Sequence, residues 1–216
     1  MAHGPIRGLR FIHAAIRAQA AEIQTRCAAM TEPAQAAGVT DAVAMLARAT
    51  RAHAQGEDEG YFPTLAERCE AGTVEPFQAD HVDENGRLDQ LEQLASACTS
   101  HEELGRLAQV ASEVREHLGA HMTREEELLW PLTEEKFSPP EQGAIMGAIM
   151  QAVPREHLPR LIPWMTEMQS PEDAVVYVQL LQKLQPPEVF SMSAGWIREG
   201  VSPDRLTVLK AKVEGL

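Results

Sequence analysis

The chain has 216 residues, of which 44% are hydrophobic, so it can bury the core of a globular protein. Its formal net charge is −13, with 32 acidic residues against 19 lysines and arginines. This charge disfavours nucleic acid and anionic membranes as partners. No segment approaches the roughly 18 consecutive apolar residues of a membrane span, and the N-terminus lacks the apolar stretch of a signal peptide.

The three cysteines, Cys27, Cys69 and Cys98, form no C-x-x-C or zinc-knuckle motif. An odd number of widely spaced cysteines is typical of reduced thiols. We therefore expect a soluble, cytoplasmic protein.

The first part of the chain predicts four helices. Residues 5–30 are rich in alanine and place isoleucines and leucines at helical spacing. A second helix should begin near Thr40 and run to about Tyr61, where Pro63 kinks or stops it. The third covers about 76–97.

The fourth predicted helix follows Ser100, which with Glu103 forms a capping-box pattern, and it ends at Pro131. Four long helices with modest connections predict an all-α fold, an antiparallel four-helix bundle over residues 1–138. After residue 138, prolines divide the chain into short helical pieces. We expect residues 139–216 to form a helical extension packed on the bundle. Its frequent methionines could form an adaptable protein-binding surface or fill the core.

Two stretches of the bundle repeat one pattern. Residues 52–63 read "AHAQGEDEGYFP" and residues 120–131 read "AHMTREEELLWP", so both fit A-H-x3-E-[DE]-E-x2-[FW]-P. In a helix, residues four apart share one face. Two His–Glu pairs with matching flanks therefore indicate a two-fold site.

Each predicted helix carries a histidine or a His–Glu pair at an interior position: His13, His53 with Glu57, His81, and His121 with Glu125. Helix bundles hold two metal ions with such sets, because carboxylates can bridge the ions while imidazoles bind each one terminally. Mixed imidazole and carboxylate ligands suit iron or manganese.

Each signal also has a purely structural interpretation. A single histidine is commonly a core or boundary residue, and a His–Glu pair in an acidic protein can lie exposed. The occurrence of such residues on all four predicted helices favours a metal site. We expect no ligand role for His3, His101 and His157. His117, one turn before His121, could be an outer partner or an extra ligand, and it is kept outside the predicted site.

In these residues the chain resembles a hemerythrin-like (HHE, cation-binding) domain, especially the hemerythrin domains of plant BRUTUS-type iron-sensing ubiquitin ligases. The family order H…H-x3-E…H…H-x3-E is met, and further similar stretches include "GPIRGLRFIHAAIR", "DHVDENGRLD" and "LPRLIPWM". The resemblance covers roughly residues 5–168.

The resemblance implies a non-heme di-iron centre. One iron would be bound by His13 and His53, the other by His81 and His121, with Glu57 and Glu125 bridging. Zinc or manganese could replace the iron.

The chain departs from the family in two respects. Oxygen-carrying hemerythrins have a second histidine four residues after the one at position 81, where this chain has Asn85. One iron is then short of a histidine unless Glu84 or water takes its place. No RING or zinc-ribbon cysteines follow, so ligase activity is not implied.

Three functions fit these observations. The first is a di-iron protein that senses or handles iron, with oxygen, peroxide or nitric oxide as its small ligand. The second is a di-iron enzyme that decomposes peroxide or oxidises a small substrate, since the Asn85 departure favours an open coordination position. The third is a metal-stabilised helical module that binds a protein partner through its C-terminal extension.

Overall fold

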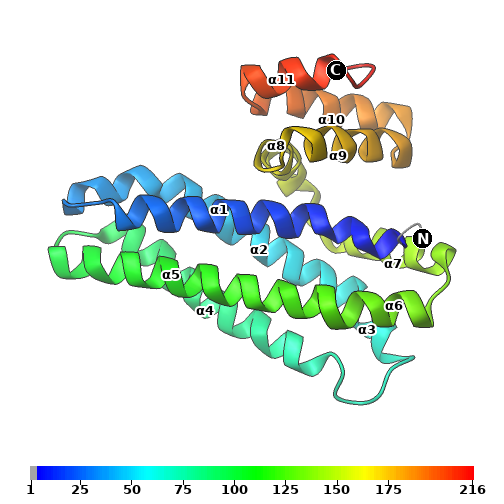
Figure 1. The fold of residues 1–216 in the computed structure, drawn as a ribbon, viewed down its shortest axis with the longest axis horizontal. Helices are drawn as coiled ribbons and strands as arrows, with labels where there is room; N and C mark the ends of the chain where they lie inside the picture. The colour runs from blue at the N-terminus through cyan, green and yellow to red at the C-terminus, as the bar shows by residue number, and fades with distance from the viewer. Residues whose placement is uncertain (1–3) are drawn as a thin grey trace. The chain divides into compact units, whose positions relative to one another are not determined.

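The computed structural model describes residues 4–216, and across them the chain is helical without strands (Figure 1). His3 lies outside the described residues. Contact clustering divides the chain into two compact units. The first comprises the described residues up to Leu9 together with Gln19–Val153, and the second comprises Arg10–Ala18 and Pro154–Leu216.

The first unit contains the four long helices of the predicted bundle: α1 (Arg10–Ala28), whose residues from Gln19 onward belong to it, α2 (Thr40–Gly60), α4 (Glu75–Ala97) and α5 (His101–Arg124). Helix α4 packs against both α2 and α5. The last turns of α1 contact α5, where Gln24 Nε2 donates to Ser112 Oγ at 3.0 Å. The prediction of an all-α, four-helix bundle is confirmed.

Shorter elements connect and extend these helices: η1 (Pro5–Leu9), η2 (Pro33–Val39), α3 (Phe62–Ala66), the π-helical segment η3 (Glu125–Leu129), α6 (Trp130–Lys136) and α7 (Pro139–Ala152). The predicted capping box before α5 is present, with Ser100 Oγ accepting from the Glu103 N–H at 3.2 Å. Ser138 and Glu141 form another at the start of α7.

The prediction that the fourth helix ends at Pro131 is wrong. The helical path continues through α6 to Lys136. Between α5 and α6 the backbone widens into the π turn, in which the Trp130 N–H bonds to the Glu125 carbonyl. Proline is tolerated in the first turn of a helical segment because those N–H groups need no partner within it. Pro131 occupies that position in α6.

The second unit has its own core. Besides residues 10–18 it contains η4 (Arg155–His157), α8 (Leu158–Met168), α9 (Pro171–Leu184), α10 (Pro187–Gly200) and α11 (Pro203–Lys210). Its apolar cluster includes Phe11, Tyr177, Phe190, Ile197 and Leu209. Met165 packs against this cluster, whereas Met192 is 57% exposed, so the methionines have no single role.

The C-terminal part of the second unit begins at Pro154, so α7 belongs to the first unit. The boundary expected at residues 138/139 stays a prediction. Among residues 4–216, no helix combines the length and the apolar character that crossing a membrane requires.

Candidate metal centre

Helix α2 provides the first His–Glu pair. His53 and Glu57 lie one turn apart, both are buried, and His53 Nε2 is 3.4 Å from Glu57 Oε2. The spacing thus brings imidazole and carboxylate to one face of the helix, as the sequence predicts. Burial removes both groups from water, which is costly for a carboxylate without a cation or a proton.

The second pair lies where α5 passes into the π turn. His121 Nε2 is 3.1 Å from Glu125 Oε1, and both side chains are buried. Glu125 is the first residue of the π segment, and such segments recur at functional sites because they change the direction in which side chains point. The Glu125 carboxylate reaches across to α2, where its Oε2 is 3.9 Å from His53 Nε2.

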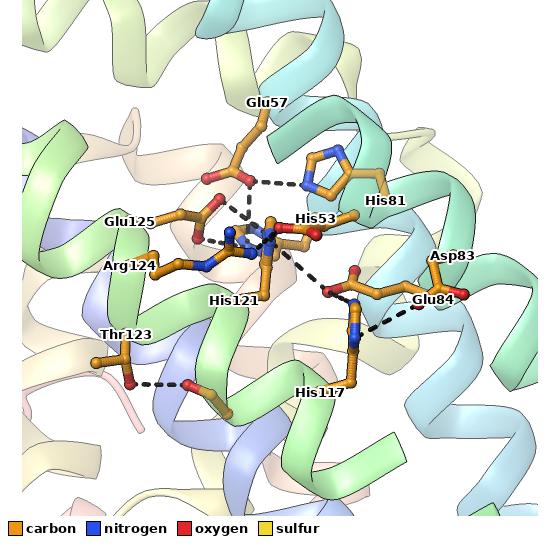
Figure 2. Close-up of polar contacts among 12 residues, drawn as sticks. His53, Glu57, His81, Asp83, Glu84, His117, His121, Thr123, Arg124 and Glu125 are labelled. Carbon is orange, nitrogen blue, oxygen red and sulfur yellow. Dashed lines mark hydrogen bonds and ion pairs between the residues drawn. The ribbon is translucent and has the colours of Figure 1, made fainter. Parts of the chain in front are cut away.

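His81 of α4 joins these pairs from a third helix. Its Nε2 is 3.5 Å from Glu57 Oε2, and its ring meets the His121 ring edge-on at 5.0 Å between centroids. Glu57, His81, His121 and Glu125 each offer a donor atom, and these four atoms lie within 4.8 Å of one another. Figure 2 shows Glu57 and Glu125 facing the histidines.

His53, Glu57 and Glu125 form a second group of potential donors within the first unit. His13 is fully buried on α1, in the part of that helix that clusters with the second unit. Both groups contain Glu57 and Glu125. Five of the six residues predicted as ligands therefore fall into these two groups, and metal binding by them and by His13 stays a prediction.

Two aspartates orient the histidines, and neither belongs to a His–Glu pair of the sequence. Asp58 Oδ1 lies 3.1 Å from His81 Nδ1, and Asp80 Oδ2 lies 3.1 Å from His121 Nδ1. A carboxylate on one ring nitrogen holds the imidazole so that the other nitrogen faces the metal. The sequence offers one signal for these aspartates, because each stands next to a predicted ligand: Asp58 follows Glu57, and Asp80 precedes His81.

The acidic and basic groups of the site have pKa values that depart from their usual ones. Burial raises the pKa of Glu57 well above its usual value, and the nearby Glu125 raises it further. Burial also lowers the pKa of His81. At His121, burial acts to lower the pKa, but the hydrogen bond and charge of Glu125 outweigh it and raise the value to about 9.

Some donor atoms in this site have no hydrogen-bond partner of normal geometry, namely both oxygens of Glu57 and Nε2 of His81. Buried polar atoms are nearly always satisfied, so unsatisfied ones indicate a missing partner. Since they are an imidazole nitrogen and carboxylate oxygens facing each other, the residues fit a bound metal ion.

Glu84, the candidate additional ligand, lies on the far side of His121. Its Oε1 is 3.9 Å from His121 Nδ1, whereas the donor groups lie on the Nε2 side. Asn85 is exposed. His117 is partly exposed and contacts Glu84, while His101 is exposed at the start of α5 and His157 is partly exposed just before α8.

Comparison with known proteins agrees with this geometry. Residues 1–65 match the family described as the hemerythrin HHE cation binding domain. This first part of the chain is similar to a hemerythrin domain. The zinc finger protein BRUTUS of Arabidopsis thaliana is 26% identical over 138 residues, which is 63% of this chain and 11% of that protein. A BRUTUS-like zinc finger protein of the same plant is 26% identical over 198 residues, 88% of this chain and 16% of that protein.

The chain thus spans less than a fifth of the length of these relatives. No solved structure gives a significant match. The matched family binds cations, and the two donor groups could hold metal. A metal-binding helical bundle is therefore supported by both the comparison and the site.

Proposed function

We propose that the chain is a non-heme di-iron protein that senses or handles iron, oxygen, peroxide or nitric oxide. The observation that carries the proposal is that the two donor groups share Glu57 and Glu125. Shared carboxylates are what a pair of ions needs, since each can give one oxygen to each ion. His81 and His121 would then serve one iron, and His53 and His13 the other.

The donor chemistry favours iron in this proposal. Imidazole and carboxylate ligands suit iron or manganese, although zinc can occupy the same ligands. When bound, iron would supply redox chemistry toward oxygen, peroxide or nitric oxide. The chain's own residues would neutralise its charge with two carboxylates, orient the imidazoles through Asp58 and Asp80, and exclude bulk water by burial.

A di-iron enzyme that decomposes peroxide or oxidises a small substrate is a second candidate. The exposed Asn85 supplies no ligand one turn after His81, and Glu84 contacts the outer nitrogen of His121. One ion would then have fewer protein ligands and an open position, which metal catalysis requires. A third candidate is a metal-stabilised module that binds a protein partner through the C-terminal extension. Partner binding that depends on iron would favour this candidate.

The first experiment loads metal-free protein with ferrous iron under anaerobic conditions and measures iron per chain by elemental analysis. Wild type should retain two ions, whereas His81→Ala and Glu57→Gln should each lose at least one because a ligand is missing. His101→Ala is the matched control, since it removes an exposed imidazole outside the site. Wild-type iron content in both site variants would contradict the proposal.

Turnover separates sensor from enzyme. The iron-loaded protein is mixed with hydrogen peroxide, and peroxide consumption is compared with that of the same amount of free iron. A sensor should show no excess turnover but should change its melting temperature on oxidation. Catalytic consumption well above free iron would instead establish the enzyme.

A further inference from the structure

A third aspartate–histidine–carboxylate arrangement lies outside the two donor groups. Asp83 Oδ2 is 3.5 Å from His117 Nδ1, and His117 Nε2 is 3.8 Å from Glu84 Oε1 (Figure 2). The same order links Asp58, His81 and Glu57, and also Asp80, His121 and Glu125. In each case an aspartate contacts Nδ1 and a buried glutamate faces Nε2.

The inner atoms of this third arrangement lack partners. Glu84 is 3% exposed, and its Oε1 makes no hydrogen bond, as is also true of His117 Nε2. A buried carboxylate oxygen and a buried imidazole nitrogen that face each other without a hydrogen bond need a further group between them. Two ligands of one metal ion lie roughly 3–3.5 Å apart, so a shift of a few tenths of an ångström would suffice.

The location differs from that of the buried centre. Glu84 and His117 line a small pocket with Arg87, Leu88, Val114 and Leu118. The His117 side chain is 21% exposed, so solvent can supply the ion and its remaining ligands. The Arg87 charge is offset, because its Nε donates to Asp83 at 2.9 Å and its guanidinium lies 3.9 Å from Glu113.

We propose that Glu84 and His117 bind a further divalent cation, held more weakly than the ions of the buried centre. Asp83 would orient the His117 ring, and water would complete the coordination. Two protein ligands give lower affinity than four, and partial exposure lets the ion exchange with solvent. The site is built from residues outside both donor groups, so it does not depend on the di-iron proposal.

Equilibrium dialysis of the metal-free chain against Co²⁺, with elemental analysis, tests this proposal. Wild type should show tightly bound ions and then one more ion at higher free Co²⁺. His117→Ala and Glu84→Gln should each weaken the last ion at least tenfold, and His117→Ala should leave the tight ions unchanged. His101→Ala should match wild type. Far-UV circular dichroism establishes folding, and if Glu84→Gln fails to fold, His117→Ala decides the question.

The proposal is overturned if wild type shows no weaker ion, or if a folded His117→Ala variant binds it with unchanged affinity. Failure of the di-iron proposal would look different. The tight ions would then be missing from wild type, while the weaker ion would persist and remain sensitive to His117→Ala.

Discussion

At the scale of single residues, His81 and His121 each contact an aspartate that stands beside another predicted ligand in the sequence. Asp58 follows Glu57 on α2 but contacts His81 on α4, and Asp80 precedes His81 but contacts His121 on α5. Successive helix residues point about 100° apart, so an acid next to an inward ligand faces the neighbouring helix. Each helix thus positions the imidazole of the next.

Asp58→Asn tests this positioning role. The amide keeps the shape of the side chain but loses the charge that holds the His81 ring, so affinity for metal should fall about 10- to 100-fold. Competition with a chelator of known affinity measures the change. Asp89→Asn is the matched control, because it alters an exposed aspartate of α4 paired with Arg51. Equal affinity of the two variants would contradict the role assigned to Asp58.

At the scale of elements, α7 lies against the end of α2 with almost no space between the backbones. A Cβ atom at Gly60 would lie 2.5 Å from the backbone nitrogen of Ile149 and 2.6 Å from the carbonyl carbon of Ala148. A backbone contact cannot be relieved by rotating a side chain. Glycine at position 60 therefore allows α7 to cover the turn of α2 that follows Glu57.

Gly60→Ala should consequently lower the free energy of unfolding of the metal-free protein by about 1–3 kcal/mol, the usual cost of overpacking. Gly105→Ala is the control. It lies in α5 with nothing within 4 Å of an added Cβ, so it should raise the free energy of unfolding by about 0.5–1 kcal/mol. Urea unfolding followed by circular dichroism measures both changes. Stabilisation by Gly60→Ala would show that α7 does not pack there.

At the scale of the whole molecule, the acid–base groups of the site couple stability to pH. Burial raises the pKa of Glu84 to about 7, and Glu125 raises that of His121 to about 9 against the opposing effect of burial. Both groups bind a proton more tightly in the folded state than in the unfolded state. Their contribution to the free energy of unfolding is therefore complete below the pKa values of the unfolded chain, near 4.5 for Glu84 and 6.5 for His121. It is lost as the pH rises through the pKa values of the folded state.

The melting temperature of the metal-free protein should accordingly fall between about pH 5 and pH 9 as these contributions disappear. Metal should have the opposite effect, because it competes with protons for the ligands and binds more tightly as pH rises. The difference in melting temperature between loaded and metal-free protein should therefore widen with pH. Thermal unfolding over this range measures it, with Glu84→Gln as a variant whose metal-free slope should be shallower. A constant difference would contradict the linkage.

Much of the fold could be predicted because helical periodicity, capping residues and prolines act locally. The bounds expected for α2 and α4 agree with the structure to within about a residue, and the capping box at Ser100 is present. The π turn was missed, because nothing in "EEELLWP" distinguishes a widened turn from an ordinary helix end. Leu128 is 58% exposed within that turn.

For the site, the sequence by itself determined which residue types occur on which helix and which of them share a face, since a spacing of four residues has one geometric meaning in a helix. Only the tertiary structure decided the distances between helices. Those distances bring His81 to Glu57, place Asp58 and Asp80 behind the rings, and put Glu84 with His117 instead of with the buried donors. Such pairings depend on side-chain packing between segments far apart in the chain, and no local pattern encodes them.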